Sequence, residues 1–129
     1  MISVSLCMIV KNEEDVLARC LESAAGVVDE IIVVDTGSTD RTREIAARFT
    51  RQIYSFPWRD DFAAARNESF SHASMDYCMW LDADDVLLEA DQAALLALKE
   101  TLDPAVSVVM APYHTGFDEG GRVTFSYYR

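Results

Sequence analysis

Short apolar runs alternate with amphipathic segments along almost the whole chain. The runs are rich in β-branched or other apolar residues and lack the three-to-four-residue spacing of a helix, so each predicts a strand. The run EIIVVD is apolar at consecutive positions, which is typical of a strand buried on both faces of a parallel sheet. The expected strands are Ser3–Val10, Glu30–Asp35, Gln52–Phe56, Tyr77–Leu81 and Val106–Tyr113.

Helical spacing appears between these runs. Asn12 is expected to cap the first helix, with Glu13, Glu14 and Asp15 in its first turn, where acidic groups favour the helix dipole. Gly26 is expected to end that helix. In the third helix, the spacing predicts that Phe62 faces the core together with Ala65, Ser69, Phe70 and Ala73. The later helices are expected from Asp40 to about Phe49, over Asp61–Ala73, and from about Asp91 to Leu102.

Strands that alternate with helices predict an α/β fold, a Rossmann-like domain whose mostly parallel sheet carries helices on both faces. Gly120-Gly121 predicts a terminal β-hairpin into Arg122–Tyr128, which would make the end of the sheet mixed. We expect a single domain over residues 1–129. Because the last residues still have the pattern of a strand, we also expect this domain to be truncated at its C-terminus.

The amino-acid composition disfavours some binding partners and indicates the cellular compartment. Half of the 129 residues are hydrophobic, enough for a core, and the formal net charge of −11 disfavours a nucleic acid or an anionic membrane surface. Cys7, Cys20 and Cys78 lie in or beside apolar runs without close pairing, which indicates buried, reduced thiols and a cytoplasmic chain. No apolar run approaches the ~20 residues of a membrane span, so no transmembrane segment is expected.

Polar residues follow three of the expected strands. Lys11-Asn12-Glu13 follows the first, Asp35-Thr36 ends the second, and Asp82-Ala83-Asp84-Asp85 follows the fourth. Because ligands of doubly wound sheets bind at the carboxyl ends of the strands, we expect these groups to meet at one rim.

The Asp82–Asp85 segment holds three carboxylates within four residues. Such groups repel one another unless a cation joins them, and Mg²⁺ or Mn²⁺ prefers oxygen ligands, including those of a diphosphate. A solvated turn is the alternative interpretation. The five glycines form neither GxGxxG nor GxxxxGK[ST], so a metal rather than a glycine-rich loop would have to bind phosphate.

Four stretches together resemble the amino-terminal half of a family 2 glycosyltransferase with the GT-A fold. They are SLCMIVKNEED, DEIIVVDTGSTDRT, WRDDFAAARNESF and YCMWLDADD, in the order and spacing of that family. The resemblance covers nearly the whole chain. It implies a nucleotide-diphospho-sugar donor held at the rim through a divalent metal, and transfer of the sugar to an unknown acceptor.

The resemblance also implies residue roles. Asp82-Ala83-Asp84 is similar to the DxD motif of the family, with Asp84 as the metal ligand and Asp82 near the ribose or the metal. The first strand exit, from Val10 through Lys11 and Asn12 to Glu13, would border the nucleotide base. The family has two adjacent acidic residues after its second strand. Here Asp35 matches the first and Thr36 stands at the second, which leaves the identity of the base open. Arg66 is similar to a basic position near the donor, and pairing with Asp60 or Asp61 is the alternative.

Other residues are not assigned to the chemistry. The general base of inverting members lies later than DxD, and neither Asp118 nor Glu119 matches it, so no catalytic residue is assigned. His72 is interpreted as a surface or partly packed residue, while His114 is a weaker candidate on the acceptor side. Trp58 and Trp80 are interpreted as core or rim packing residues rather than as platforms for a sugar.

Three other functions stay open. A non-catalytic module that binds nucleotide-sugars or proteins would keep the fold and lack the chemistry. A receiver domain would need an acidic pair after its first strand and a lysine after its fifth, which this chain lacks, and a nucleotidyltransferase would need an early basic loop. The C-terminal strands are expected to expose an edge or apolar surface that favours a homodimer.

Overall fold

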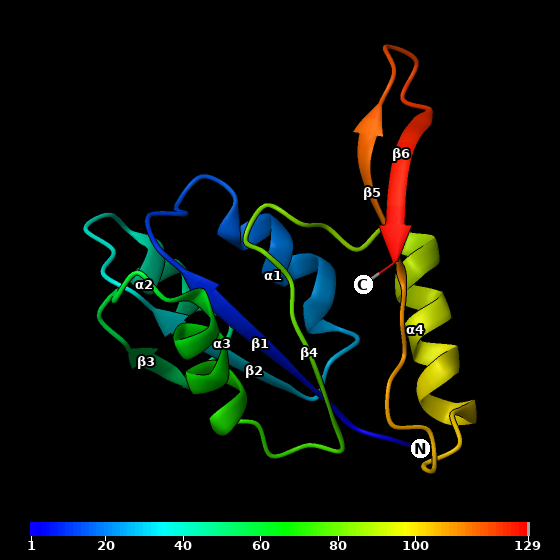
Figure 1. Ribbon diagram of the computed structural model, residues 1–129, viewed down its shortest axis with the longest axis horizontal. Helices are drawn as coiled ribbons and strands as arrows, with labels where there is room; N and C mark the ends of the chain where they lie inside the picture. The colour runs from blue at the N-terminus through cyan, green and yellow to red at the C-terminus, as the bar shows by residue number, and fades with distance from the viewer. Residues whose placement is uncertain (129) are drawn as a thin grey trace.

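The computed structural model describes residues 1–128, except for the side chains at positions 124, 125 and 127. Strands and helices alternate as far as the fourth helix, and two further strands follow (Figure 1). The strands are β1 (Val4–Val10), β2 (Glu30–Asp35), β3 (Ile53–Ser55), β4 (Tyr77–Met79), β5 (Pro112–Phe117) and β6 (Val123–Tyr128). The helices are α1 (Leu17–Ala25), α2 (Thr42–Ala46), α3 (Phe62–Ser71) and α4 (Glu89–Thr101).

The first four strands form one parallel sheet in the order β3-β2-β1-β4. The chain adds strands on one side of β1 as far as β3 and then crosses over to place β4 on the other side. The point where the strand order reverses therefore lies between β1 and β4. In an open α/β sheet this is where ligands bind, at the carboxyl ends of the strands.

Helices cover both faces of this sheet, as the sequence predicts. Helix α3 packs on β1 and β2 from one face, whereas α1 and α2 contact each other on the opposite face (Figure 1). Residues of β1, β2 and α1 fill the space between the layers. The fully buried members of this core include Leu6, Met8, Leu17, Leu21, Ile32 and Val33.

The prediction that Asn12 caps the first helix is wrong. Helix α1 begins only at Leu17, and its first turn contains no acidic residue. Asn12 has a positive φ of 52°, and its side-chain oxygen accepts a hydrogen bond from the backbone N–H of Thr39 at 2.7 Å. The segment after β1 is therefore held by the loop after β2, which draws it away from a helical path. Gly26 does end α1, as predicted.

The prediction for the inner face of α3 is wrong at one position. Ala65 and Ser69 are buried, and Asp61 caps the helix by accepting a hydrogen bond from Ala64 N–H. Phe62, however, is 71% exposed. It is the first residue of the helix, and its ring contacts that of Trp58 edge to face.

The fifth strand begins later than the sequence pattern predicts. Residues 106–111 are not in a strand, and β5 starts at Pro112. It pairs with β6 in an antiparallel two-stranded sheet that is separate from the parallel sheet and projects past the first turn of α4 (Figure 1). The apolar run that starts at Val106 has no strand partner among the described residues. The apolar side chains of this run therefore lie on the surface, with Val108 74% and Met110 62% exposed.

Helix α4 is tied to the rest of the domain by Lys99, one of the buried residues of the chain. Its ammonium group donates to Val27 O at 2.8 Å and lies 2.7 Å from Asp29 Oδ2, while its own carbonyl accepts from Ile2 N–H. Pairing Lys99 holds the pKa of Asp29 below its usual range. Among residues 1–128, no helix combines the length and the apolar character needed to cross a bilayer.

The cysteines are free, as predicted, but not all are buried. Cys7 and Cys20 are buried, and burial together with neighbouring Cys78 raises the pKa of Cys7 to about 12. Cys78 is exposed, which corrects the expectation of three buried thiols. It lies on β4, the edge strand of the parallel sheet, whereas Cys7 lies on β1 at the centre.

The carboxylate of Glu30 joins four segments at the amino end of the sheet. It accepts hydrogen bonds from the hydroxyls of Ser5 and Ser74, both at 2.7 Å, and from the side chain of Gln52 at 3.1 Å. Burial by itself would raise the pKa of Glu30, but the bonds from Ser74, Ser5 and Gln52 outweigh it and lower the pKa to about 2.

This pKa predicts a dependence of stability on acid. Because the folded pKa of Glu30 lies below the ordinary 4.5, its contribution is complete above about pH 4.5 and is lost as the pH falls toward 2. The free energy of unfolding of Glu30→Gln should therefore be lower than that of the wild type near pH 7 and should approach it near pH 2. Urea unfolding across this range measures the difference, with exposed Glu22→Gln as control. A difference that does not change with pH would contradict the assignment.

Candidate functional site

The carboxyl ends of β1, β2 and β4 meet at one rim, and polar groups predicted from the sequence lie there. Lys11, Asn12 and Glu13 follow β1, whereas Asp35 and Thr36 close β2. Asp82 and Asp84 lie in the turn that follows β4 and Leu81. The reversal of strand order places this last group beside the exit of β1.

The segment after β1 is built against the loop after β2. Asn12 N–H donates to Ser38 Oγ at 2.9 Å, and Glu13 N–H donates to the buried Thr42 Oγ1 at 2.8 Å. These bonds fix the backbone and leave the side chains of Lys11 and Glu13 toward the rim. Lys11 is exposed, and Glu13 is half-buried.

Asp35 and Thr36 lie beneath this segment and are each only 5% exposed. Thr36 donates both its backbone N–H and its hydroxyl to Val10 O, at 3.0 and 3.3 Å, so it binds β2 to β1. Asp35 accepts from the backbone N–H and hydroxyl of Ser38 and pairs with Arg43 at 3.3 Å. Both residues therefore hold the rim together, and their side chains are already engaged within the protein.

The Asp82–Asp85 turn is closed by its own backbone. Asp82 N–H donates to Asp85 Oδ2 at 2.8 Å, and Asp85 N–H donates to Asp82 O at 2.9 Å. Ala83 is 4% exposed and packs in the core cluster, which turns the flanking carboxylates outward. Helix α1 supports the turn, since Arg19 donates to Asp84 O at 3.2 Å and Cys20 to Asp82 O at 3.5 Å.

The three carboxylates of this turn converge. One oxygen from each of Asp82, Asp84 and Asp85 lies within 4.8 Å of the others. Opposite ligands of Mg²⁺ lie about 4.2 Å apart, so a small side-chain movement would bring these oxygens into one coordination shell. Only oxygen ligands are offered, which suits a hard divalent cation.

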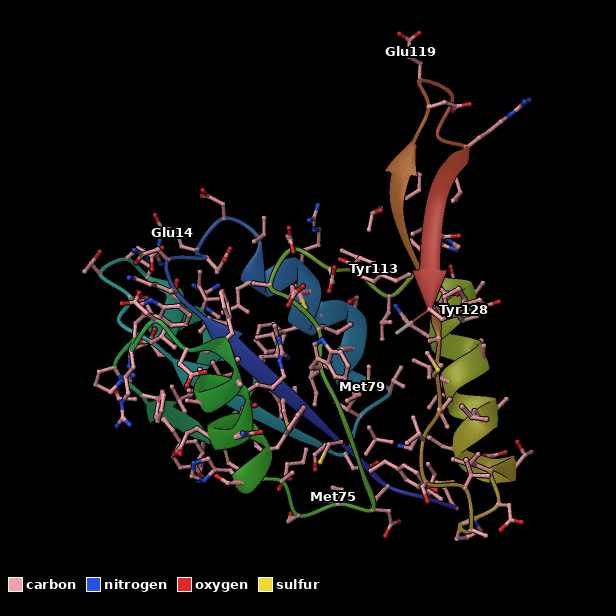
Figure 2. The ribbon with its side chains drawn as sticks, in the orientation of Figure 1. Glu14, Met75, Met79, Tyr113, Glu119 and Tyr128 are labelled. Carbon is pink, nitrogen blue, oxygen red and sulfur yellow. The ribbon has the colours of Figure 1, made fainter. Side chains whose placement is uncertain are left out.

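The three carboxylates are not equally engaged. Asp85 accepts a hydrogen bond from the hydroxyl of Tyr113, at the start of β5 (Figure 2). Asp82 lies 3.9 Å from the guanidinium of Arg66. Within residues 1–128, the carboxylate of Asp84 makes no hydrogen bond or ion pair, and the residue is exposed. It is therefore the group of this turn that can move to a ligand at least cost.

Arg66 extends from α3 toward this turn. Its guanidinium lies 5.2 Å from the centre of the Trp80 ring, a cation–π distance, and faces Asp82. The guanidinium of Arg66 therefore lies beside the acidic turn. Asp61 instead caps α3, and Asp60 accepts the indole N–H of Trp58.

Negative charge accumulates between the strand exits. The pKa of Glu13 is raised, first by burial and then by the charges of Asp84, Asp40 and Asp82. Acidic groups of the loop after β2 and of the turn after β4 therefore both act on the carboxyl group of Glu13. Repulsion of this kind is relieved when a cation binds among the carboxylates.

A pocket of about 260 Å³ opens at the exits of β1 and β2. Its residues come from three segments: the end of β1 with the loop after it, the exit of β2, and the segment before α3 together with the first residue of that helix. They are Ile9, Val10, Lys11, Glu13, Thr36, Trp58 and Phe62. Trp58 packs edge to face on Phe62 at this rim, which agrees with its interpretation as a core or rim packing residue.

Other residues considered from the sequence lie away from this site. Asp118 accepts from the backbone N–H groups of Gly120 and Arg122 in the hairpin turn, and Glu119 lies at the hairpin tip, far from the sheet (Figure 2). His114 is an exposed residue of β5. His72 stacks on Tyr54 with ring centres 3.6 Å apart and contacts Glu68, so it is partly packed as predicted.

This architecture defines a GT-A-like α/β domain, a parallel sheet with an acidic, metal-compatible turn at its switch point. The chain belongs to glycosyl transferase family 2, whose family model matches residues 5–125. The resemblance found in the sequence is thereby confirmed, and the receiver-domain alternative is wrong.

Curated relatives extend well beyond the region that they share with this chain. A TPR repeat-containing protein of Synechococcus elongatus is 49% identical over 88 residues, which are 68% of this chain and 22% of that protein. Glycosyltransferase SunS of Bacillus phage SPbeta is 29% identical over 114 residues, 86% of this chain and 27% of the relative. The lipopolysaccharide core biosynthesis glycosyltransferase LpsC of Rhizobium meliloti is 32% identical over 122 residues, 88% of this chain and 44% of LpsC.

Solved structures share the fold. Glucosyl-3-phosphoglycerate synthase of Mycobacterium tuberculosis, in complex with Mn²⁺ and UDP-glucose, aligns with a TM-score of 0.57 and 27% identity, over 66% of this chain and 34% of the synthase. S. aureus TarS aligns with a TM-score of 0.60 at 21% identity, over 76% of this chain and 32% of TarS, a likeness of fold alone.

The contact between Tyr113 and Asp85 yields a prediction about the rim. Tyr113→Phe removes the hydroxyl that binds the carboxylate of Asp85, and the free energy of unfolding should fall by about 1.5–3 kcal/mol, as for a hydrogen bond to a charged group. Chemical denaturation measures this loss. Tyr128→Phe, an exposed tyrosine of β6, is the matched control, and equal losses in the two variants would contradict the role of Tyr113.

Proposed function

We propose that this chain is the donor-binding domain of a metal-dependent glycosyltransferase. It binds a nucleotide-diphospho-sugar at the rim, and the protein transfers the sugar to an acceptor whose identity stays open. The observation that carries this proposal is the convergence of Asp82, Asp84 and Asp85 at the switch point, beside the exit of β1. Membership of glycosyl transferase family 2 supplies the reaction class.

The residues of the turn fit a divalent metal, Mn²⁺ or Mg²⁺. Asp84 is the proposed direct ligand because its carboxylate is disengaged, and Asp82 is the second, close to Arg66. When bound, such a cation stabilises the negative charge that develops on the departing nucleoside diphosphate. Asp85 remains bound to Tyr113 and to Asp82 N–H, and so holds the turn in the shape that presents the other two carboxylates.

The other rim residues are proposed to hold the rest of the donor. Val10, Lys11, Asn12 and Glu13 form its border at the exit of β1, with Lys11 as the exposed cation. Ala83 sets the spacing of the two aspartates because its buried side chain fixes the turn. Thr36 and Asp35 act by keeping β1, β2 and the Ser38 loop in place, and Arg66 offers positive charge toward the diphosphate.

A relative of known structure supports the choice of ligand. Glucosyl-3-phosphoglycerate synthase of M. tuberculosis has been solved with Mn²⁺ and UDP-glucose, and also with Mg²⁺ and UDP. For this chain, a uridine nucleotide with either metal is therefore the first ligand to test. We assign no general base, since Asp118 and Glu119 serve the hairpin turn. We propose a cytoplasmic location from the unpaired cysteines.

Calorimetric titration with UDP and GDP, each with and without Mn²⁺, tests the donor site. Wild-type protein should bind one of the two nucleotides in a metal-dependent manner, and Asp84→Ala should lower that affinity at least tenfold because the metal loses a ligand. Asp91→Ala, an acid on α4 away from the rim, is the control and should bind like the wild type. Equal binding by the wild type and Asp84→Ala, or binding that ignores the metal, would refute the proposed site.

The C-terminal part of the chain supports a second proposal, association into a homodimer. Apolar side chains are exposed on residues 106–110 and on the hairpin, including Val108 at 74%, Met110 at 62%, Phe117 at 58% and Tyr128 at 68%. Exposed patches of this kind mark surfaces that associate.

Light scattering at rising concentration tests association. We expect the average mass to rise above that of a single 14.4 kDa chain, and Val108→Ser with Met110→Ser to reduce the rise. A constant monomeric mass at high concentration would contradict the proposal.

A further inference from the structure

The pocket at the exits of β1 and β2 has an aromatic side that the donor-site residues do not explain. Trp58 and Phe62 line it together, and their rings meet edge to face with centres 4.7 Å apart. Phe62 is 71% exposed although it begins a helix whose neighbouring Ala65 is buried. Two aromatic rings that line an open pocket together can stack against a flat ligand.

The backbone on both sides of this pocket is strained. Among the described residues, Asn12 and Asp60 are the two non-glycine residues with positive φ, at 52° and 55°. Asn12 lies between the pocket residues Lys11 and Glu13, and Asp60 lies between Trp58 and Phe62. Strain of this kind persists only where the surroundings impose it, and it clusters at binding sites.

Both residues with positive φ are held by hydrogen bonds of their side chains. The indole N–H of Trp58 donates to Asp60 Oδ1 at 2.9 Å, which fixes the ring to the turn that precedes α3. Asn12 Oδ1 accepts from Thr39 N–H at 2.7 Å and fixes the loop after β1. The two walls of the pocket are therefore set before any ligand arrives.

The position of the pocket identifies the part of a ligand that it fits. Its floor is Val10 and Thr36, joined across β1 and β2. The acidic turn follows β4, on the other side of β1, so the pocket lies on the β2 side of a diphosphate held at that turn. Nucleobases are flat, and every base can stack on an aromatic ring because each has a π-face.

We infer that Trp58 and Phe62 are affinity-determining residues for the nucleobase of the donor. This inference rests on the proposed function and adds the recognition of the base to it. The ring of Trp58, fixed by its bond to Asp60, is the surface on which the base stacks, and Phe62 packs against the edge of that ring. Glu13 and Lys11 offer polar contacts to the edge of the base. The phosphates are held separately, at the acidic turn.

Comparison of a ligand with a base and one without it tests this division. UDP, GDP and pyrophosphate are titrated, each with Mn²⁺, into the full chain and into Trp58→Leu, Trp58→Phe and Phe62→Leu. Trp58→Leu should weaken nucleotide binding about tenfold or more, as for loss of one stacking contact, and should leave pyrophosphate binding unchanged. Trp58→Phe should restore much of the affinity. Phe117→Leu, a similarly exposed phenylalanine on the hairpin, should change neither.

The outcomes separate this inference from the proposed function. If wild-type protein binds pyrophosphate but binds neither nucleotide more tightly, the metal site stands and the base pocket is overturned. Unchanged nucleotide affinity in Trp58→Leu, or an equal loss for nucleotide and pyrophosphate, also overturns it. Failure of the wild type to bind any of the three ligands overturns the proposed function, and the inference with it. Circular dichroism of each variant identifies loss of folding. If Trp58→Leu does not fold, the nucleotide and pyrophosphate affinities of Phe62→Leu decide the test.

Discussion

The structure depends on the central position of β1, which pairs in parallel with β2 on one side and β4 on the other. Parallel strands end at the same edge, so this arrangement brings the loops after β1, β2 and β4 together. The reversal of strand order at β1 separates these loops enough to leave room for a ligand. The acidic turn, the aromatic pocket and Arg66 all take their places from this constraint.

The acidic turn would be unfavourable without its support. Three carboxylates lie within 4.8 Å, and their repulsion is opposed by contacts to the turn from α1, α3 and β5. Arg19 and Cys20 bind its carbonyls, Arg66 lies near Asp82, and Tyr113 binds Asp85. A protein that keeps such a turn in place loses some stability to the repulsion, and a bound cation would recover it. This is the physical reason for connecting the turn with a metal-bound diphosphate.

The amino end of the sheet shows the contrasting use of a carboxylate. Glu30 is surrounded by hydroxyl and amide donors, which lower its pKa to about 2, whereas Glu13 at the opposite end has acidic neighbours and a raised pKa. Neither shift follows from the local sequence, because Ser5, Ser74 and Gln52 are distant from Glu30 along the chain, as Asp40 and Asp84 are from Glu13. One end of the sheet thus gains stability from a charge, and the other end keeps charges available for a ligand.

The sequence by itself determined the parallel α/β class, the four strands of the main sheet, and the location of Asp35 and of Asp82–Asp85 at strand ends, because periodicity and turn chemistry are local properties. It could not determine which side chains at those ends would be engaged. Asn12 matches a helix cap locally, but contact with Thr39 draws it into a different conformation. Phe62 fits a buried helix face, but in the structure it lines an open pocket and is exposed. The run from Val106 has strand composition without a strand partner among residues 1–128. Only tertiary contacts decided these positions, because pairing and burial depend on what lies opposite a residue, and the chain brings those neighbours from far along its length.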